Sequence, residues 1–208
     1  MSRCVLIGGA GIRRYDLLRP RLREDDFIVC CDSGLKHREP LGVTADLIVG
    51  DFDSHENPRL STETIVLPRE KDDTDTFYAA KEMLARGFRD FWLIGVCGGR
   101  LDHTLGNLAL LEYLTARGAK ALATDDYSDL EIIPAGTAAV VEDVYPFFSL
   151  LNISGRAEGI TIRGAKYPLS DADITCEFPY GISNEVLPGQ RAEITLRAGS
   201  LLLIRILP

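Results

Sequence analysis

The stretch FWLIGVCGGRLDHTLGNLALLEYLTARG, residues 91–118, decides the fold class of this chain. Residues 91–96 are almost all apolar and predict a buried strand, which ends in the turn Cys97-Gly98-Gly99-Arg100. The segment from His103 to Arg117 has leucines at a helical spacing, and Gly118 follows it, as is common just beyond the end of a helix. A strand that leads through a glycine turn into a helix predicts an α/β fold.

The same alternation of strands and helices continues around this stretch. A second helix is expected before it, capped by Asp72 or Asp73 and ended by Gly87. The apolar side of that helix is expected to carry Phe77, Ala80 and Leu84. Strands that alternate with helices form βαβ units, so the sequence predicts a parallel sheet. Its other strands are expected at residues 3–7, 27–31, 47–49, 64–67 and 119–123.

The pattern changes after about residue 128. Helical periodicity disappears, and short β-rich runs alternate with glycine and proline turns, which is typical of an antiparallel sandwich or barrel. We therefore expect an α/β domain with a parallel sheet over residues 1–128 and an all-β antiparallel sandwich over residues 129–208. Strands of the second domain are expected at residues 138–141, 147–153, 159–162, 192–196 and 201–206.

Composition and charge exclude several classes of protein. The 208 residues are 46% hydrophobic and 26% charged, which is ordinary for a globular protein. With 23 basic and 31 acidic residues the net charge is −8, which argues against a nucleic-acid partner and favours a cationic or metal-bound substrate.

The cysteines and the apolar runs bear on the compartment. Five cysteines, with Cys30 and Cys31 adjacent and no CxxC unit, argue against a disulfide framework or a zinc site. The apolar run near the start is shorter than a signal peptide needs, and no stretch is long enough to span a membrane. The expected compartment is the cytoplasm.

Three acidic or arginine-bearing segments are candidates for chemistry. Asp51 and Asp53 directly follow a strand, where an extended chain would direct both carboxylates to one side as ligands for Mg²⁺. A polar, capped turn accounts for this pair equally well. In Lys71-Asp72-Asp73-Thr74-Asp75, helix capping explains one or two carboxylates but not three beside a lysine.

The third segment is Gly98-Gly99-Arg100-Leu101-Asp102-His103, at the junction of a strand and a helix. Glycines let the backbone approach a ligand, a helix N-terminus favours anions, and arginine binds phosphate. A tight turn with a surface arginine is the alternative interpretation.

Several familiar motifs are missing. The chain has no GxxxxGK[ST], HExxH or GxSxG motif and no cluster of cysteine and histidine. Gly9-Ala10-Gly11 is only a fragment of a dinucleotide fingerprint. The scattered histidines His37, His55 and His103 are expected to be surface or capping residues rather than metal ligands.

Taken in order, these segments resemble the bacterial thiamine pyrophosphokinase family. The resemblance spans nearly the whole chain, and the order GDFDS, KDxTD, GRxDH is far more specific than any of its pieces. The resembling segments are Cys31-Asp32-Ser33-Gly34, Val49 to Ser54, Lys71 to Asp75, Gly98 to His103 with Asn107, Gly164 to Leu169, Gly181 to Glu185 and Gly199 to Leu202.

The resemblance implies an ATP-binding catalytic α/β domain, a thiamine-binding β-sandwich and a homodimer whose site is shared between subunits. ATP and thiamine would be the substrates, with Mg²⁺ as cofactor. Its implied metal and phosphate ligands are Asp51, Asp53 and Asp75, with Asp75 also close to thiamine. The residues implied to face ATP are Asp32, Lys71, Arg100, Asp102 and His103. Those implied to line the thiamine pocket are Ser183 and Asn184.

The implied reaction is attack of the thiamine hydroxyl on the β-phosphorus of ATP, with AMP leaving and Asp75 or Asp72 accepting the proton. Two departures from the family pattern stand out. Ser33 stands where the family commonly has a glycine. Some relatives stack an aromatic side chain of the second domain on thiamine, but the only tryptophan here, Trp92, lies in the first domain, so the resemblance does not identify the stacking residue. The candidates for that ring are Tyr167, Phe178 and Tyr180.

Two rival functions remain at the level of sequence. A pyrophosphokinase for a pterin or a related heterocyclic alcohol would share the ATP half and differ around Gly181-Ile182-Ser183-Asn184. A non-catalytic nucleotide-binding sensor would need the arginine and the glycines but not so many carboxylates.

Overall fold

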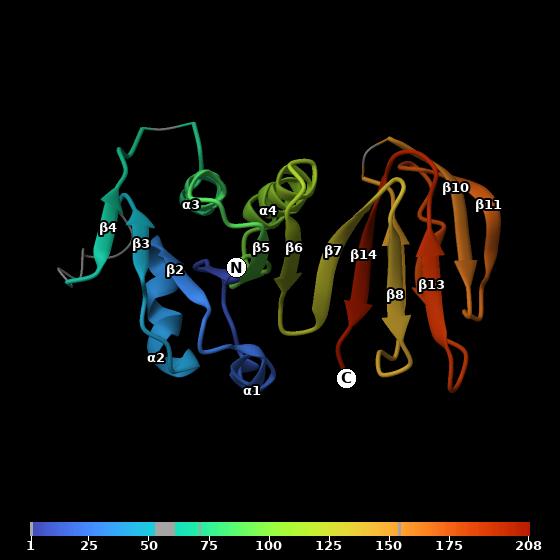
Figure 1. Ribbon diagram of the computed structural model, residues 1–208, viewed down its shortest axis with the longest axis horizontal. Coiled ribbons are helices and arrows are strands. Elements are labelled where there is room, and N and C mark those ends of the chain that lie inside the picture. The colour runs from blue at the N-terminus through green and yellow to red at the C-terminus, as the bar shows by residue number, and fades with distance from the viewer. Residues whose placement is uncertain (1, 53–60, 71, 154) are drawn as a thin grey trace. The chain divides into compact units, whose positions relative to one another are not determined.

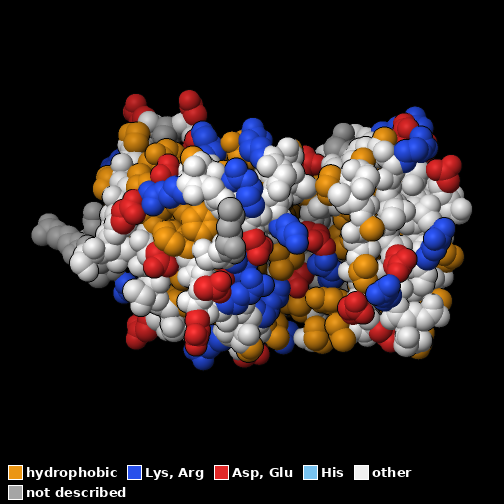
Figure 2. All heavy atoms as spheres, viewed as in Figure 1, with side chains coloured by type: hydrophobic (Ala, Val, Ile, Leu, Met, Phe, Trp, Pro, Cys, Tyr) orange, Lys and Arg blue, Asp and Glu red, His pale blue; other side chains and the backbone are white. Residues whose placement is uncertain are grey.

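The computed structural model describes residues 2–52, 61–70, 72–153 and 155–208 (Figure 1). The chain divides into two compact units, Met1–Asp126 and Tyr127–Pro208. On the face drawn in Figure 2, acidic and basic side chains intermingle over both units.

The first unit is built on a parallel sheet, as the sequence predicts. Its described strands lie in the order β6-β5-β1-β2-β3-β4, and every neighbouring pair is parallel. The strands are β1 (Cys4–Ile7), β2 (Phe27–Cys31), β3 (Leu47–Gly50), β4 (Glu63–Val66), β5 (Asp90–Ile94) and β6 (Lys120–Thr124).

Helices cover both faces of this sheet. The longer helices α3 (Asp75–Ala85) and α4 (Leu101–Thr115) lie on one face, and the short helices α1 (Tyr15–Leu18) and α2 (Arg38–Leu41) on the other (Figure 1). Two short 3₁₀ segments adjoin the short helices: η1 (Arg19–Arg21) follows α1, and η2 (Asp32–His37) precedes α2. Because both faces are covered, β1 and β3 are buried at every position, which explains their continuous apolar sequence.

The predicted helices exist, but details of the prediction were wrong. Thr74, not Asp72 or Asp73, caps α3: its Oγ1 accepts a hydrogen bond of 3.2 Å from the backbone nitrogen of Phe77. The fully buried residues of α3 are Ala79, Ala80 and Met83, so of the expected apolar side only Ala80 is fully buried.

In α4 only the second half is buried. Leu105 is 56% exposed, whereas Leu110, Leu111 and Leu114 are fully buried. The first turns of α4 line the pockets of the site described below, and their leucines keep the helical spacing without the burial.

The second unit is an antiparallel β-sandwich, again as predicted. Its core contains side chains from both sheets, among them Val141, Phe148, Ile160, Ile194 and Leu203, and no residue described in 127–208 is helical. One sheet has the order β12 (Gly181–Asn184), β9 (Phe148–Leu151), β14 (Ser200–Ile206), β7 (Ser128–Pro134). The other has the order β11 (Leu169–Thr175), β10 (Arg156–Arg163), β13 (Arg191–Thr195), β8 (Ala138–Glu142).

Three of these strands, β7, β11 and β12, do not appear in the sequence prediction. β7 begins with Ser128 and Asp129 and ends at Pro134, and β11 carries aspartates at 171 and 173. β12 has four residues, and Ser183 within it has φ of 57°. Pairing with β10 and β9 makes β11 and β12 strands, although several of their residues favour turns. β7 pairs with β14 and also contains the strand formers Ile132 and Ile133.

All five cysteines lie within the described residues and are free thiols. None of the helices that the structure describes is long and apolar enough to cross a membrane.

Candidate active site

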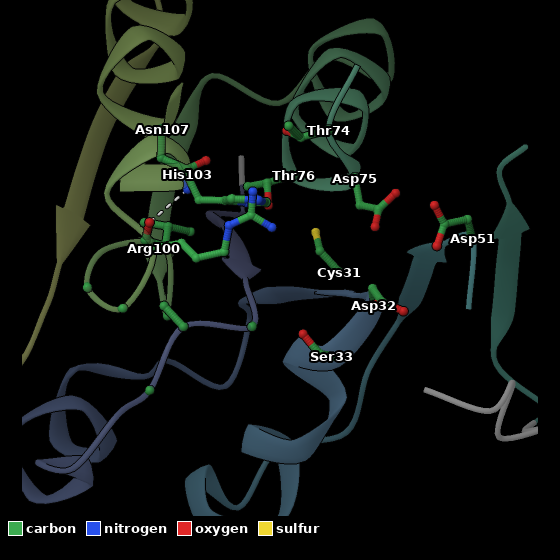
Figure 3. Close-up of a pocket in the computed structure, with 17 residues that line it drawn as sticks. Cys31, Asp32, Ser33, Asp51, Thr74, Asp75, Thr76, Arg100, His103 and Asn107 are labelled. Carbon is green, nitrogen blue, oxygen red and sulfur yellow. Dashed lines mark hydrogen bonds between the residues drawn. The ribbon is translucent and has the colours of Figure 1, made fainter. Parts of the chain in front are cut away.

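A cavity of about 540 Å³ opens at the carboxyl ends of the strands of the first unit (Figure 3). Its walls are the turn after β1, the start of η2, the end of β3, the N-terminus of α3 and the turn between β5 and α4. Strand order reverses between β1 and β5, so the cavity lies at the switch point of the sheet, where parallel α/β folds bind ligands.

Three carboxylates converge at one side of this cavity. Asp32 is the first residue of η2, Asp51 follows β3 directly, and Asp75 is the first residue of α3. One ligand atom from each lies within 4.8 Å of those of the other two (Figure 3). Asp32 is only 8% exposed. Sequence reasoning placed Asp32 toward the nucleotide and did not group it with Asp51 and Asp75.

Backbone conformation brings Asp32 and Asp51 together. A Cβ on Gly50 would lie 3.1 Å from the Cα of Asp32, so the glycine lets η2 approach the end of β3. Asp32 itself has φ of 43°, and Phe52 has φ of 55°. A non-glycine residue in this left-handed region costs about 1–2 kcal/mol, which the packing of Phe52 against the buried core of the unit offsets.

The positive φ of Phe52 also corrects one expectation. An extended chain would direct Asp51 and Asp53 to the same side, but the chain turns at Phe52 instead of remaining extended. Asp53 lies outside the described residues, as do Lys71 and His55.

The start of α4 carries Arg100, Asp102 and His103. Two of them, Arg100 and His103, line the side of the cavity opposite the three carboxylates (Figure 3). The Arg100 guanidinium donates to both carboxylate oxygens of Asp102, at 3.1 Å from Nε and 2.5 Å from Nη2. This contact lowers the pKa of Asp102 to about 2, so the carboxylate stays charged and orients the arginine.

The turn before α4 is fixed by side chains of the helix. Asn107 Nδ2 donates to the carbonyl of Val96 at 2.7 Å, and Thr104 Oγ1 accepts from the nitrogen of Gly98 at 3.1 Å. Gly98 and Gly99 have φ of 92° and 70°, which glycine adopts without strain. The glycines predicted to allow close backbone approach therefore line the cavity.

Asp72 lines a neighbouring pocket of about 450 Å³ between the starts of α3 and α4. Asp73 and Asp102 line the same pocket, and Asp73 accepts a 2.7 Å hydrogen bond from Lys81. Of the two proposed bases, Asp75 lies among the three converging carboxylates and Asp72 does not.

Ser183 and Asn184 lie on β12 of the second unit. Asn184 is 6% exposed, and its amide holds the turn at Tyr167: Oδ1 accepts from the nitrogen of Tyr167 at 3.0 Å, and Nδ2 donates to its carbonyl at 2.9 Å. Ser183 is exposed. The exposed aromatic and apolar residues of this unit include Tyr167, Phe178, Tyr180 and Ile182, each more than half exposed.

Sequence reasoning missed other residues of the cavity. Cys31, Ser33, Thr74 and Thr76 line it, although no role was expected for them. The first three lie in segments that carry the family resemblance, and Thr76 follows one of these segments directly. Of the two roles expected for His37, the surface one was wrong, whereas the residue does stand at the N-cap position of α2, without a capping bond from its side chain. His37 is 2% exposed and contacts the turn after β1, because η2 packs against that turn.

The close packing of Gly9 against Ser33 gives a first prediction. A Cβ on Gly9 would lie 1.9 Å from Ser33 Oγ, so Gly9→Ala should overpack the cavity wall and lower the melting temperature by several degrees. Adding Ser33→Gly should restore most of that loss. Thermal unfolding of the single and double variants checks this, and a double variant no more stable than Gly9→Ala would contradict it.

Carboxylates, an arginine and glycine turns at the switch point of a parallel sheet are the features of a site that binds nucleotide phosphates together with a metal ion. Comparison with known proteins narrows this class. The family model "Thiamin pyrophosphokinase, catalytic domain" matches residues 18–123, and "Thiamin pyrophosphokinase, vitamin B1 binding domain" matches residues 138–201.

Individual relatives agree with the family models. The chain is 31% identical over 163 residues to the thiamine pyrophosphokinase of Bacillus subtilis (strain 168), covering 75% of this chain and 76% of the relative. The fold resembles the crystal structure of thiamin pyrophosphokinase from Geobacillus thermodenitrificans, with a TM-score of 0.83 and 27% identity over 100% of this chain and 98% of the other. The B. subtilis crystal structure has a TM-score of 0.87 and 24% identity over the full length of both chains. The chain belongs to the thiamine pyrophosphokinase family.

Proposed function

We propose that this chain transfers a pyrophosphate group from ATP to the hydroxyl of thiamine, giving thiamine diphosphate and AMP. The observation that carries this proposal is the convergence of Asp32, Asp51 and Asp75 in a cavity that Arg100 also lines. A nucleotide sensor would need the arginine and the glycine turns, but not three carboxylates gathered within a few ångströms.

The carboxylate cluster fits Mg²⁺. Its donors are oxygens only, which is the ligand chemistry of a hard cation, and Mg²⁺ in phosphate-transfer sites takes one or two carboxylates together with substrate phosphates and water. We propose Asp51 and Asp75 as ligands, with Asp32 in reach and Asp53 as a further candidate. A bound Mg²⁺ would neutralise phosphate charge.

The chain's own residues supply the rest of the chemistry. Arg100, oriented by Asp102, would bind phosphate oxygens, and the Gly98-Gly99 turn would let backbone amides approach them. His103 would add a contact on the same side. Lys71, which the resemblance implies to face ATP, is proposed as a further positive charge for the phosphates. These groups position ATP for in-line attack, which is most of what such a transfer needs.

In the transfer step the thiamine hydroxyl oxygen bonds to the β-phosphorus, and the bond from that phosphorus to the α,β-bridging oxygen breaks, so AMP leaves. The hydroxyl proton passes to a carboxylate. We favour Asp75 as this base over Asp72, because Asp75 faces the cavity and Asp72 lines the neighbouring pocket.

The thiamine side belongs to the second unit in this proposal. Ser183 and one of the exposed rings Tyr167, Phe178 and Tyr180 would contact thiamine, while Asn184 would hold the Tyr167 turn in place. We propose a homodimer in which the second unit of one copy completes the site of the other. Exposed apolar side chains on this unit support an association of this kind.

The proposed compartment is the cytoplasm, where thiols stay reduced. The five free cysteines support this, since Cys4, Cys30, Cys31 and Cys97 are buried as small apolar side chains.

The test is to incubate the protein with ATP, Mg²⁺ and thiamine and to separate the products chromatographically. Thiamine diphosphate and AMP should appear in equal amounts. ADP with thiamine monophosphate would contradict pyrophosphate transfer. A hydroxymethylpterin in the same panel tests the rival acceptor, and nucleotide binding without turnover would indicate a sensor.

A further inference from the structure

The turn after β1 forms one wall of the cavity. Residues 9–11 of this turn line it, and the backbone amides of the turn are bound to the end of β5. The nitrogen of Gly8 donates to the carbonyl of Ile94 at 2.9 Å, and that of Ala10 to the carbonyl of Gly95 at 2.8 Å. One side of the turn is therefore tied to the sheet.

The carbonyls of the same turn are bound by η2. Lys36 Nζ donates to the carbonyl of Gly9 at 2.5 Å, and His37 Nε2 lies 2.8 Å from the carbonyl of Ala10. Because η2 begins at Asp32, it links this wall of the cavity to the carboxylate cluster.

The hydrogen bonds of His37 determine its tautomer. The carbonyl of Ala10 can only accept, so the proton is on Nε2, and Nδ1 then accepts from the Tyr15 hydroxyl at 2.7 Å. His37 is 2% exposed, and its burial lowers its pKa, which the hydrogen bond to Ala10 opposes and the charge of Lys36 reinforces. Both ring nitrogens of a neutral, buried histidine are thus used for contacts.

We propose that His37 is a positioning residue that holds the Gly9–Gly11 wall in the conformation that binds the nucleotide. His37 is not one of the residues that line the cavity, so it would act through the carbonyl of Ala10. The inference rests on the proposed function insofar as the cavity binds ATP. Loss of the His37 side chain should therefore weaken nucleotide binding and leave thiamine binding unchanged.

Two substitutions separate the two ring contacts. In His37→Gln the side-chain amide can place a donor where Nε2 lies, so the bond to Ala10 survives. In His37→Asn the shorter side chain places its amide where Nδ1 of the histidine lies. It can still contact the Tyr15 hydroxyl but no longer reaches the carbonyl of Ala10. Both variants lose the ring, so they share the packing loss and differ in the contact to the turn.

The experiment measures binding of a non-hydrolysable ATP analogue with Mg²⁺ by calorimetry. His37→Asn should raise the Kd about tenfold, and His37→Gln about threefold or less, as expected for loss or retention of one buried hydrogen bond. In turnover assays at saturating ATP, the KM for thiamine should change less than twofold in both variants.

The control is Asp26→Asn, which removes the buried ion pair with Arg3 next to the start of β1, at the other end of the strand from the cavity. It should lower the melting temperature without changing the analogue's Kd. Equal Kd values for His37→Asn and the unchanged protein would overturn the proposal. So would an equal rise in Asp26→Asn, because the effect would then be one of stability.

The outcomes separate this proposal from the proposed function. If the chain binds the analogue but makes no thiamine diphosphate, the function fails and the His37 comparison still stands on Kd alone. A chain that does not bind the analogue would overturn both.

Discussion

Asp75→Asn is expected to lower kcat by at least about a hundredfold while leaving the fold intact, since it removes one charge from the carboxylate cluster. Asp51→Asn should behave in the same way, and so should Asp53→Asn if Asp53 joins the cluster. The carboxamide keeps the size of the side chain, so the melting temperature should stay within a few degrees.

Turnover is measured at increasing Mg²⁺ for each variant, with circular dichroism as the check on folding. Asp73→Asn is the matched control, because this nearby carboxylate pairs with Lys81 in the neighbouring pocket. Near-normal activity of Asp75→Asn and Asp51→Asn at saturating Mg²⁺ would rule out the metal assignment.

Mixing two inactive variants should restore activity if the site is shared between subunits. The first is Asp75→Asn. The second is Ser183→Lys, which puts a long cation on an exposed position of β12, where it would repel the positively charged thiazolium. Ser183 is preferred to Asn184, whose removal would release the turn at Tyr167.

The expected recovery follows from two-fold symmetry. A mixed dimer with shared sites has one site with both lesions and one with neither. Random exchange makes about half of the dimers mixed, so about a quarter of the unmodified activity should return. If each site lies within one chain, every site in the mixture keeps a lesion and activity stays at the level of the single variants.

Differently tagged subunits and pull-down show whether exchange has taken place. Absence of recovery in a mixture with demonstrated exchange would exclude the shared site. Full activity of Ser183→Lys alone would remove Ser183 from the thiamine pocket.

The sequence by itself determined the two-domain plan. Apolar runs ending in glycine, followed by helical spacing, identify β5 and α4, and the loss of that spacing beyond residue 128 identifies the sandwich. These signals are local, because burial of a whole strand or of one helix face is visible in neighbouring residues. Arg100 and Asp75 were found for the same reason, as charged residues placed at the ends of such elements.

Tertiary structure decided the contacts between distant segments. Asp32 joins Asp51 and Asp75 only because Gly50 allows η2 to approach β3, and Phe52 turns the chain away from an extended path. His37 is buried only because η2 packs on the turn after β1. β11 and β12 are strands because they pair with β10 and β9. The spacing of neighbouring residues does not reveal these contacts. Each of them joins segments that are distant in the sequence and that lie close together only because of the order of the strands in the sheets.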